Sequence, residues 1–128
     1  MKFHRDGALP EAGEIFVFGS NMAGRHGAGA AKVAREKFGM VTGCWAGRWG
    51  HCYAIPTKDS TLTTLRLNVI HGFAITFVHY ANATPHLEYF VTRVGCGLAG
   101  YRDDEIAPMF RDAGENCSFA EEWRPHLT

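Results

Sequence analysis

Two glycine-rich segments of the chain carry residues that can bind an anion. The first follows an apolar run and spans 19–32, and the second follows another apolar run and spans 95–101. Glycine adopts positive φ at little cost and lets backbone N–H groups approach a ligand, while the dipole of a following helix favours negative charge there. A loop that uses glycine only for packing is the alternative for either segment alone. Two such loops at one sheet edge favour a site that holds a diphosphate from both sides.

Common phosphate-binding patterns and zinc sites do not fit these residues. The first loop lacks both the G-K-[ST] ending of a P-loop and the G-x-G-x-x-G fingerprint with its later acid. The cysteines and histidines lack the paired short spacing of zinc sites, so we expect neither a metal nor another cofactor. Cys96, next to an expected helix N-terminus, is a candidate nucleophile if its thiol pKa is lowered. The alternative is a small residue that fits a tight loop.

The apolar pattern predicts alternating strands and helices that position the two loops. Continuous apolar runs predict strands over 15–18, 52–55, 89–94 and 116–119. Helix-favouring composition, or an apolar stripe at three- and four-residue steps, predicts helices over 28–38, 62–81 and 103–113. Gly39 is expected to end the first helix, and Pro108 to bend the last one. The segment 40–50 is either a weak strand or a loop.

This order of elements predicts the fold class. We expect a single α/β domain over residues 1–128, with a mixed, mostly parallel sheet between helices on both faces. Such an arrangement has three layers, α/β/α. Ligands of these sheets bind beyond the carboxyl ends of the strands. Both glycine loops follow such ends, so the architecture and the loops predict the same site.

The composition limits the classes of function. Thirteen basic and thirteen acidic residues give no net charge, which disfavours binding to nucleic-acid phosphates. No stretch approaches the length of a membrane span, and the first ten residues lack the apolar core of a signal peptide. Four dispersed cysteines are typical of reduced thiols. We therefore expect a soluble, cytoplasmic protein without a membrane partner.

Three motifs together resemble the macro domain. The pattern S-N-x-x-G-x-x-G-A-G-A-A begins at Ser20, P-T-K begins at Pro56, and G-C-G-L begins at Gly95. They are most similar to the branch that contains terminal ADP-ribose protein glycohydrolases and the DNA ADP-ribosyl glycohydrolase antitoxins, and to small phage-encoded macro-like proteins. The resemblance covers about 15–110. It implies a macro-like domain that binds ADP-ribose or a related nucleotide, signalling nucleotides included.

The resemblance also implies roles for residues of both loops. Asn21 would hydrogen-bond the distal ribose, and the backbone of 27–29 would contact the diphosphate. Residues 95–99 would form the second phosphate loop, and Tyr101 would stack on the ligand or close over it. The complete set of expected ligand-binding residues is Gly19, Ser20, Asn21, Gly24, His26, Gly27, Ala28, Gly29, Thr57, Gly95, Cys96, Gly97, Leu98, Ala99, Gly100 and Tyr101.

An alternative function implied by the resemblance is hydrolysis of ADP-ribosylated protein or nucleic acid. Lys58 matches the lysine that attacks the anomeric carbon in the hydrolytic branch, and a solvated lysine in a turn is the alternative. That branch places an acid directly after G-C-G-L, where this chain has Ala99. Asp103 or Asp104 would have to substitute, unless they only cap a helix. Loss of a general acid-base lowers turnover about 10²–10⁴-fold, so Ala99 favours binding over catalysis.

The N-terminus and one aromatic segment leave further questions. Macro domains carry an earlier strand and an acid that reads adenine; only fourteen residues precede Ile15, and Asp6 matches that acid poorly. Trp45, Arg48, Trp49 and His51 are expected to cover the ligand, and a hydrophobic loop folded onto the domain or a dimer contact are the alternatives. A third function, nucleic-acid binding, would use the tryptophans with the basic side chains Arg25, Arg48 and Arg93. Trp123 is expected in the core.

Overall fold

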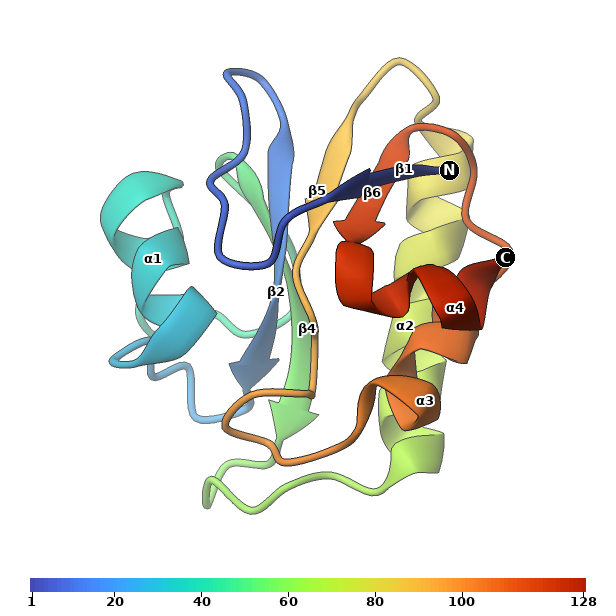
Figure 1. Cartoon of the computed structure of the whole chain (residues 1–128). Coiled ribbons are helices and arrows are strands. Elements are labelled where there is room, and N and C mark those ends of the chain that lie inside the picture. Colours follow the sequence, from blue (N-terminus) through green and yellow to red (C-terminus); the bar gives the residue numbers. More distant parts are fainter.

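A computed structural model describes residues 1–128 of the chain. Six strands form one sheet in the spatial order β1-β6-β5-β2-β4-β3 (Figure 1). All neighbouring strands pair in parallel except β3 and β4, which confirms the expected mixed, mostly parallel α/β sheet. In chain order the strands are Lys2–His4, Ile15–Asn21, Gly47–Trp49, Cys52–Lys58, Tyr89–Val91 and Cys117–Ala120.

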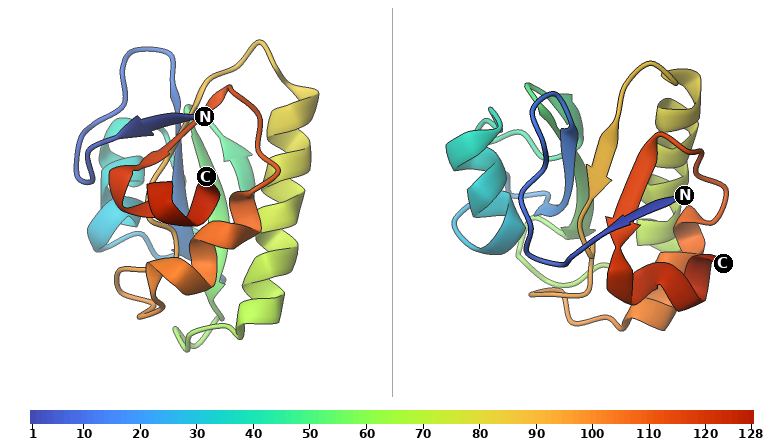
Figure 2. Two further views of the ribbon diagram at one scale, coloured as in Figure 1. Left: turned by 45° about the vertical axis from the view of Figure 1, so that its right-hand side comes forward. Right: turned by 45° about the horizontal axis from the view of Figure 1, so that its top comes forward.

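Helices cover both faces of this sheet. The four α-helices, α1 to α4, are Gly29–Lys37, Leu67–Ala83, Asp103–Ile106 and Arg124–Leu127, and short 3₁₀ segments follow α3 at Ala107–Phe110 and precede α4 at Glu121–Trp123. The views in Figures 1 and 2 place α1 on one side of the sheet and α2 with α3 and α4 on the other. The molecule therefore has the three layers that the order of elements predicts.

The central strand β2 explains how two cores form. Ile15 and Val17 join the larger core on the α2 side, while Phe16 and Phe18 join the smaller core under α1. Side chains alternate between the faces of a strand, so a strand covered on both faces needs a continuous apolar run. Trp123 is fully buried in the larger core, as expected from the sequence.

Two helices differ from their predicted bounds for local reasons. The helix expected from residue 62 begins at Leu67, because the Asp59 carboxylate accepts hydrogen bonds from the N–H groups of Thr61 and Thr63 and closes a turn. The helix expected over 103–113 lasts one turn and continues as a 3₁₀ helix that contains Pro108. The helix does not start before Asp103, and Pro108 stands at the start of the 3₁₀ segment rather than inside a bent α-helix.

The structure corrects the expectation that no strand precedes Ile15. β1 pairs in parallel with β6, and Lys2 forms an ion pair with Glu88 at 2.7 Å. The segment between β1 and β2 then crosses the α1 side of the sheet, where Ala8 packs on the smaller core. β1 has only three residues, and its pairing partners in β6 are 116 positions away in the sequence, close to the longest separation the chain allows. None of the helices is long and apolar enough to cross a bilayer.

Candidate functional site

A cleft of about 750 Å³ lies beside the carboxyl ends of β2, β4 and β5. Its walls are the N-terminal part of α1, the segment between β1 and β2, and the loops that follow the three strands. Figure 1 shows those three loops at the same edge of the sheet. The volume is typical of a small-molecule site.

Most of the expected site residues line this cleft. They are Gly19, Ser20, Asn21, Gly27, Ala28, Gly29, Thr57, Lys58, Gly95, Cys96, Gly97, Leu98 and Ala99. Asp103 and four expected ligand-binding residues, Gly24, His26, Gly100 and Tyr101, do not line it. The two glycine loops and the P-T-K motif are thus brought together, while the expected acid is not.

Close packing of three backbones places the two loops side by side. Gly19 lies in β2 between Thr57 of β4 and Gly95, and a Cβ atom at Gly19 would lie 3.3 Å from the Thr57 methyl group. The Thr57 hydroxyl donates a hydrogen bond to the carbonyl of Ser20. Gly95 has φ +77°, and a Cβ there would lie 3.2 Å from Ile106. A larger residue at either position would have to displace a neighbouring side chain by a few tenths of an ångström, and Gly95 is also favoured by its positive φ.

The first loop is held by contacts that its own side chains and backbone make within the protein. The Asn21 side chain donates to the Arg25 carbonyl at 2.7 Å and accepts from the Arg25 N–H at 3.1 Å. Gly24, at φ +69°, packs against Gly43, where a Cβ would approach to 2.5 Å. His26 is buried, and its Nε2 lies 2.8 Å from the Cys44 carbonyl. Gly24 and His26 thus shape the loop from outside the cleft.

Both loops present backbone N–H groups that no protein atom accepts. In the first loop these groups belong to Gly27, Ala28 and Gly29, the last of which begins α1. In the second they belong to Gly97, Leu98 and Ala99. Unpaired donors at a helix start and in a glycine loop are what a phosphate group uses.

Tyr101 fixes the second loop rather than facing the cleft. Its hydroxyl donates to the Leu65 carbonyl at 2.6 Å, and its N–H donates to the Gly95 carbonyl. The Thr64 hydroxyl donates to the Ala99 carbonyl at 3.1 Å. The loop after β4 is therefore tied to the loop after β5 at two points.

The N-terminal segment builds a part of the cleft that the sequence did not predict. His4 stacks on Phe90 with ring centroids 3.7 Å apart, and its Nδ1 lies 2.7 Å from the Ser118 hydroxyl. Burial lowers the pKa of His4, while nearby Asp6 acts in the opposite direction. Further lining residues that were not predicted are Gly7, Ala8, Leu9, Phe16, Arg25, Ala30, Ala31, Val33, Leu62, Thr92, Arg93 and Val94. Among these residues, Phe16 and Phe90 belong to apolar runs that the sequence identifies, but the runs predicted strands and not a part of the cleft.

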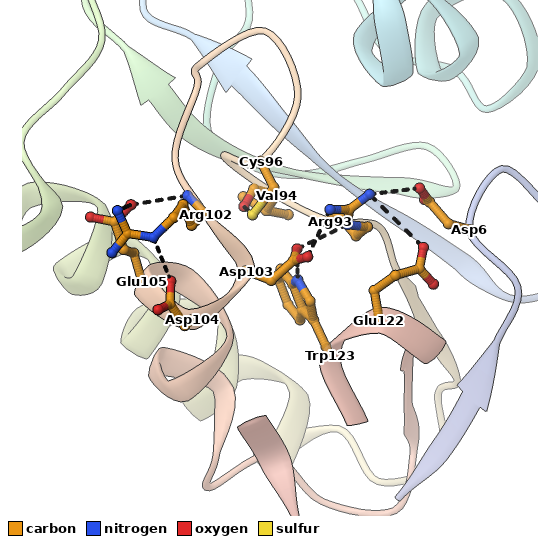
Figure 3. A network of polar contacts seen from close by, with 10 residues as sticks. All are labelled: Asp6, Arg93, Val94, Cys96, Arg102, Asp103, Asp104, Glu105, Glu122 and Trp123. Carbon is orange, nitrogen blue, oxygen red and sulfur yellow. Dashed lines mark hydrogen bonds and ion pairs between the residues drawn. The ribbon is translucent and has the colours of Figure 1, made fainter. Parts of the chain in front are cut away.

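A network of charges surrounds Arg93 at one side of the cleft (Figure 3). The Arg93 guanidinium donates to both carboxylate oxygens of Asp103, at 2.9 and 2.7 Å, and to Asp6 at 3.1 Å. Glu122 lies 3.9 Å away, and the Trp123 indole N–H donates to Asp103 at 2.8 Å. Asp103 is therefore engaged by the protein, and its proposed catalytic role stays a prediction that this geometry does not support.

The opposite side of the cleft has cations without acidic partners. Arg25 and Lys58 line the cleft and form no ion pair, whereas Asp6 is the only carboxylate that lines it. Since β2 lies between β4 and β5, Lys58 and the Arg93 network stand on opposite sides of β2. The cleft is therefore polarised.

The structure does not support two roles considered for reactive and covering residues. Burial and the nearby Asp103 carboxylate raise the pKa of the Cys96 thiol to about 12, so it is not an activated nucleophile. No residue of the segment 45–51 lines the cleft, because 47–49 form the edge strand β3 and Arg48 reaches the Tyr80 hydroxyl. No group of three or more metal-ligating side chains lies together.

Comparisons of the chain with protein-family models, curated proteins and solved structures found no match. The structure itself shows the α/β fold. The resemblance to macro domains stays a prediction that rests on the three sequence motifs.

We expect Asp103→Asn to destabilise the fold by about 2–3 kcal/mol at pH 7, since it removes the charge from a partly buried pair with Arg93. Burial opposes ionisation of Asp103, but hydrogen bonds from Arg93 and Trp123 outweigh it and lower its pKa. The ionised Asp103 therefore contributes to the free energy of unfolding above about pH 4, and this contribution is lost as the pH falls through the lowered pKa. Urea unfolding from pH 7 to pH 2 measures both effects.

Asp104→Asn is the matched control for this substitution. Its carboxylate is 55% exposed and pairs only with the exposed Arg102, so a change below about 0.5 kcal/mol is expected. Equal effects of the two variants would show that the Arg93 network does not stabilise the fold.

Proposed function

We propose that this protein binds ADP-ribose or a related ADP-ribose-type nucleotide in the cleft. The observation that carries the proposal is the two sets of unpartnered N–H groups, at 27–29 and 97–99, on either side of one cavity. Arg25 and Lys58 add positive charge that no carboxylate of the protein neutralises. A diphosphate matches both features, because it accepts several hydrogen bonds and carries two negative charges.

The dimensions and the apolar part of the cleft support a ligand longer than a diphosphate. Phe16 and Asn21 mark the ends of the β2 wall, five residue steps or about 17 Å apart. Near Phe16 the lining is apolar and aromatic, with Phe90 and Val33, as suits a nucleobase. Near Asn21 it is polar, as suits a ribose.

Asp6 supports adenine as the base. It accepts one hydrogen bond, from Arg93 to Oδ2, and its Oδ1 has no partner in the protein. A free carboxylate oxygen beside an aromatic floor suits the exocyclic amine of adenine. Asp6 thus lies beside the proposed position of the base, although its sequence context matches the adenine-reading acid of macro domains poorly. The strand β1, which precedes Asp6, places it there.

The two other candidate functions have less support. Lys58 lines the cleft, but the only carboxylate in the lining is Asp6, which lies on the other side of β2. The lining therefore contains no carboxylate near Lys58 that can act as the general acid-base for hydrolysis. Nucleic-acid binding would need Arg93, which is engaged by Asp103 and Asp6, and the tryptophans, which lie outside the cleft. Binding is therefore the function that we propose.

We expect Gly97→Asp to weaken ADP-ribose binding at least tenfold, because it adds a negative charge beside the donors of the second loop. A Cβ at Gly97 meets nothing within 4 Å and its φ is not in the left-handed region, so the fold tolerates the change. Gly97→Ala is the matched control and is expected to bind within about threefold of wild type. Calorimetric titration with ADP-ribose measures both; absence of saturable binding to the wild type refutes the proposed function.

We expect the hypoxanthine counterpart of ADP-ribose to bind about tenfold or more weakly than ADP-ribose itself. In this ligand a carbonyl oxygen replaces the exocyclic amine of adenine. That oxygen cannot donate a hydrogen bond to the Asp6 carboxylate, so two acceptors face each other. In an Asp6→Ala variant the two ligands should bind with similar affinity. Equal affinities in the wild type would contradict the assignment of Asp6 to the base.

Hydrolysis is tested separately with ADP-ribosylated protein and ADP-ribosylated DNA. Because no acid-base accompanies Lys58, we expect the wild type to release no more ADP-ribose than Lys58→Ala does. Lys32, on the same chain but outside the cleft lining, provides the control variant Lys32→Ala. Turnover that is lost in Lys58→Ala and kept in Lys32→Ala would establish the hydrolase instead.

A further inference from the structure

Leu62 has a backbone conformation that its side chain disfavours. It is the only residue other than glycine with positive φ, at +65°. For a bulky residue the left-handed region is strained, and such strain persists only where the surrounding structure imposes it. Here the surrounding turn does so, since the Leu62 N–H donates to the Asp59 carbonyl while the Asp59 side chain binds Thr61 and Thr63.

The same residue exposes its side chain at the cleft. Leu62 lines the cleft four residues after Lys58 and is 41% exposed. Leu98 also lines the cleft, is 70% exposed, and lies so close to α1 that a Cβ at Gly29 would be 3.6 Å from its Cδ1. Glycine at position 62 would remove the strain and the exposed apolar surface together, so neither folding nor solvation accounts for this leucine.

The loop contacts fix these two side chains relative to each other. The turn that carries Leu62 is joined to the loop that carries Leu98 by the hydrogen bond from Thr64 to the Ala99 carbonyl. A second hydrogen bond, from the Tyr101 hydroxyl to the Leu65 carbonyl, joins the segment that follows this turn to the same loop. Leu62 and Leu98 are therefore held at fixed positions on the cleft, and we call these two side chains its apolar mouth; the turn of Leu62 directly follows Lys58.

The charges at this mouth restrict what it can receive. Lys58 and Arg25 line the same cleft without acidic partners, so a cationic group here meets both apolar surface and repulsion. An uncharged flat or apolar group buries area against the leucines at no electrostatic cost. With the base near Phe90 and the diphosphate between the loops, the group at this mouth is the one attached to the distal ribose.

From these observations, and resting on the proposed function, we propose that Leu62 and Leu98 select the substituent on the distal ribose. The preferred ligands are ADP-ribose derivatives whose substituent at that ribose is uncharged and apolar or flat. Ligands with a cationic substituent at the same position are disfavoured.

The reduced and oxidised nicotinamide dinucleotides, NADH and NAD⁺, form a matched pair of probes. Both carry a ring of the same size on the distal ribose, and the ring is neutral in NADH and cationic in NAD⁺. We expect the wild type to bind NADH about tenfold more tightly than NAD⁺, as one close unscreened charge repulsion implies. Calorimetric titration at low ionic strength, with ADP-ribose as a third ligand, measures the difference.

Two substitutions separate the Leu62 side chain from its backbone. Leu62→Gly removes both strain and apolar surface, and Leu62→Asn keeps a residue that tolerates positive φ but removes the apolar surface. Each should weaken NADH binding about five- to tenfold, the loss expected for part of a leucine side chain, and change ADP-ribose binding less than twofold. The melting temperature of Leu62→Gly should equal or exceed that of the wild type.

Val41→Gly is the control, because Val41 is also an exposed aliphatic residue in a loop, has no positive φ, and lies outside the cleft. It should leave NADH binding unchanged. If the wild type binds ADP-ribose but binds NADH no better than NAD⁺, or if both Leu62 variants keep full NADH affinity, the inference is overturned and the proposed function stands. If the wild type binds none of the three ligands, both are overturned.

Discussion

The ion pair between Arg93 and Asp103 holds the second glycine loop in place. Arg93 precedes the loop and Asp103 begins the helix that follows it, so the pair closes the segment from both ends. The same guanidinium binds Asp6 from the N-terminal segment, and the indole of Trp123 binds Asp103 from the C-terminal segment. Both ends of the chain thus support one loop. A loop fixed in this way loses little entropy when a ligand binds to its N–H groups.

The same network determines the electrostatics of the cleft. One guanidinium faces three carboxylates, so the side of the cleft near Asp6 has no free positive charge to offer an anion. The positive charge available to an anion belongs to Arg25 and Lys58, on the side of α1 and β4. A chain with no formal net charge therefore contains a strongly polarised site, because the pairing of charges in space, not their number, decides which remain free.

Local sequence patterns predicted those parts of the fold and site that depend on neighbours along the chain. Ile15 to Phe18 form a continuous apolar run, which a central strand requires, and Gly39 ends α1 with φ +85°. The glycine loops were found for the same reason, since the tight packing of Gly19 against Thr57 and of Gly95 against Ile106 leaves little room for a side chain. Patterns of this kind need no knowledge of distant segments.

The missed parts depend on contacts between distant segments. His4 belongs to the cleft because β1 pairs with β6, and its Ser118 partner is 114 positions away. Asp103 was considered an acid-base or a helix cap, and only the fold brings Arg93 and Trp123 to it. Leu62 fits the apolar stripe of α2 in sequence, yet the side-chain hydrogen bonds of Asp59 exclude it from that helix. In each case tertiary or turn contacts override a local preference.

Departures from the rules of stable folding gather around one cavity in this protein. The N–H groups of 27–29 and 97–99 lack acceptors, Leu62 carries backbone strain, and Leu98 exposes most of its side chain. Elsewhere the buried strands and the aromatic core follow those rules closely, with a single buried side-chain atom, His26 Nδ1, left without a hydrogen bond beneath the first loop. The strain at Leu62 costs folding free energy, whereas the N–H groups of both loops belong to exposed or partly exposed residues, where water can accept their hydrogen bonds. Donors, cations and exposed apolar side chains around one cavity are features of ligand-binding sites. Because donors, cations and apolar side chains come from separate loops and line the same cleft, the proposed ligand, a diphosphate with an uncharged end, would contact all of them at once.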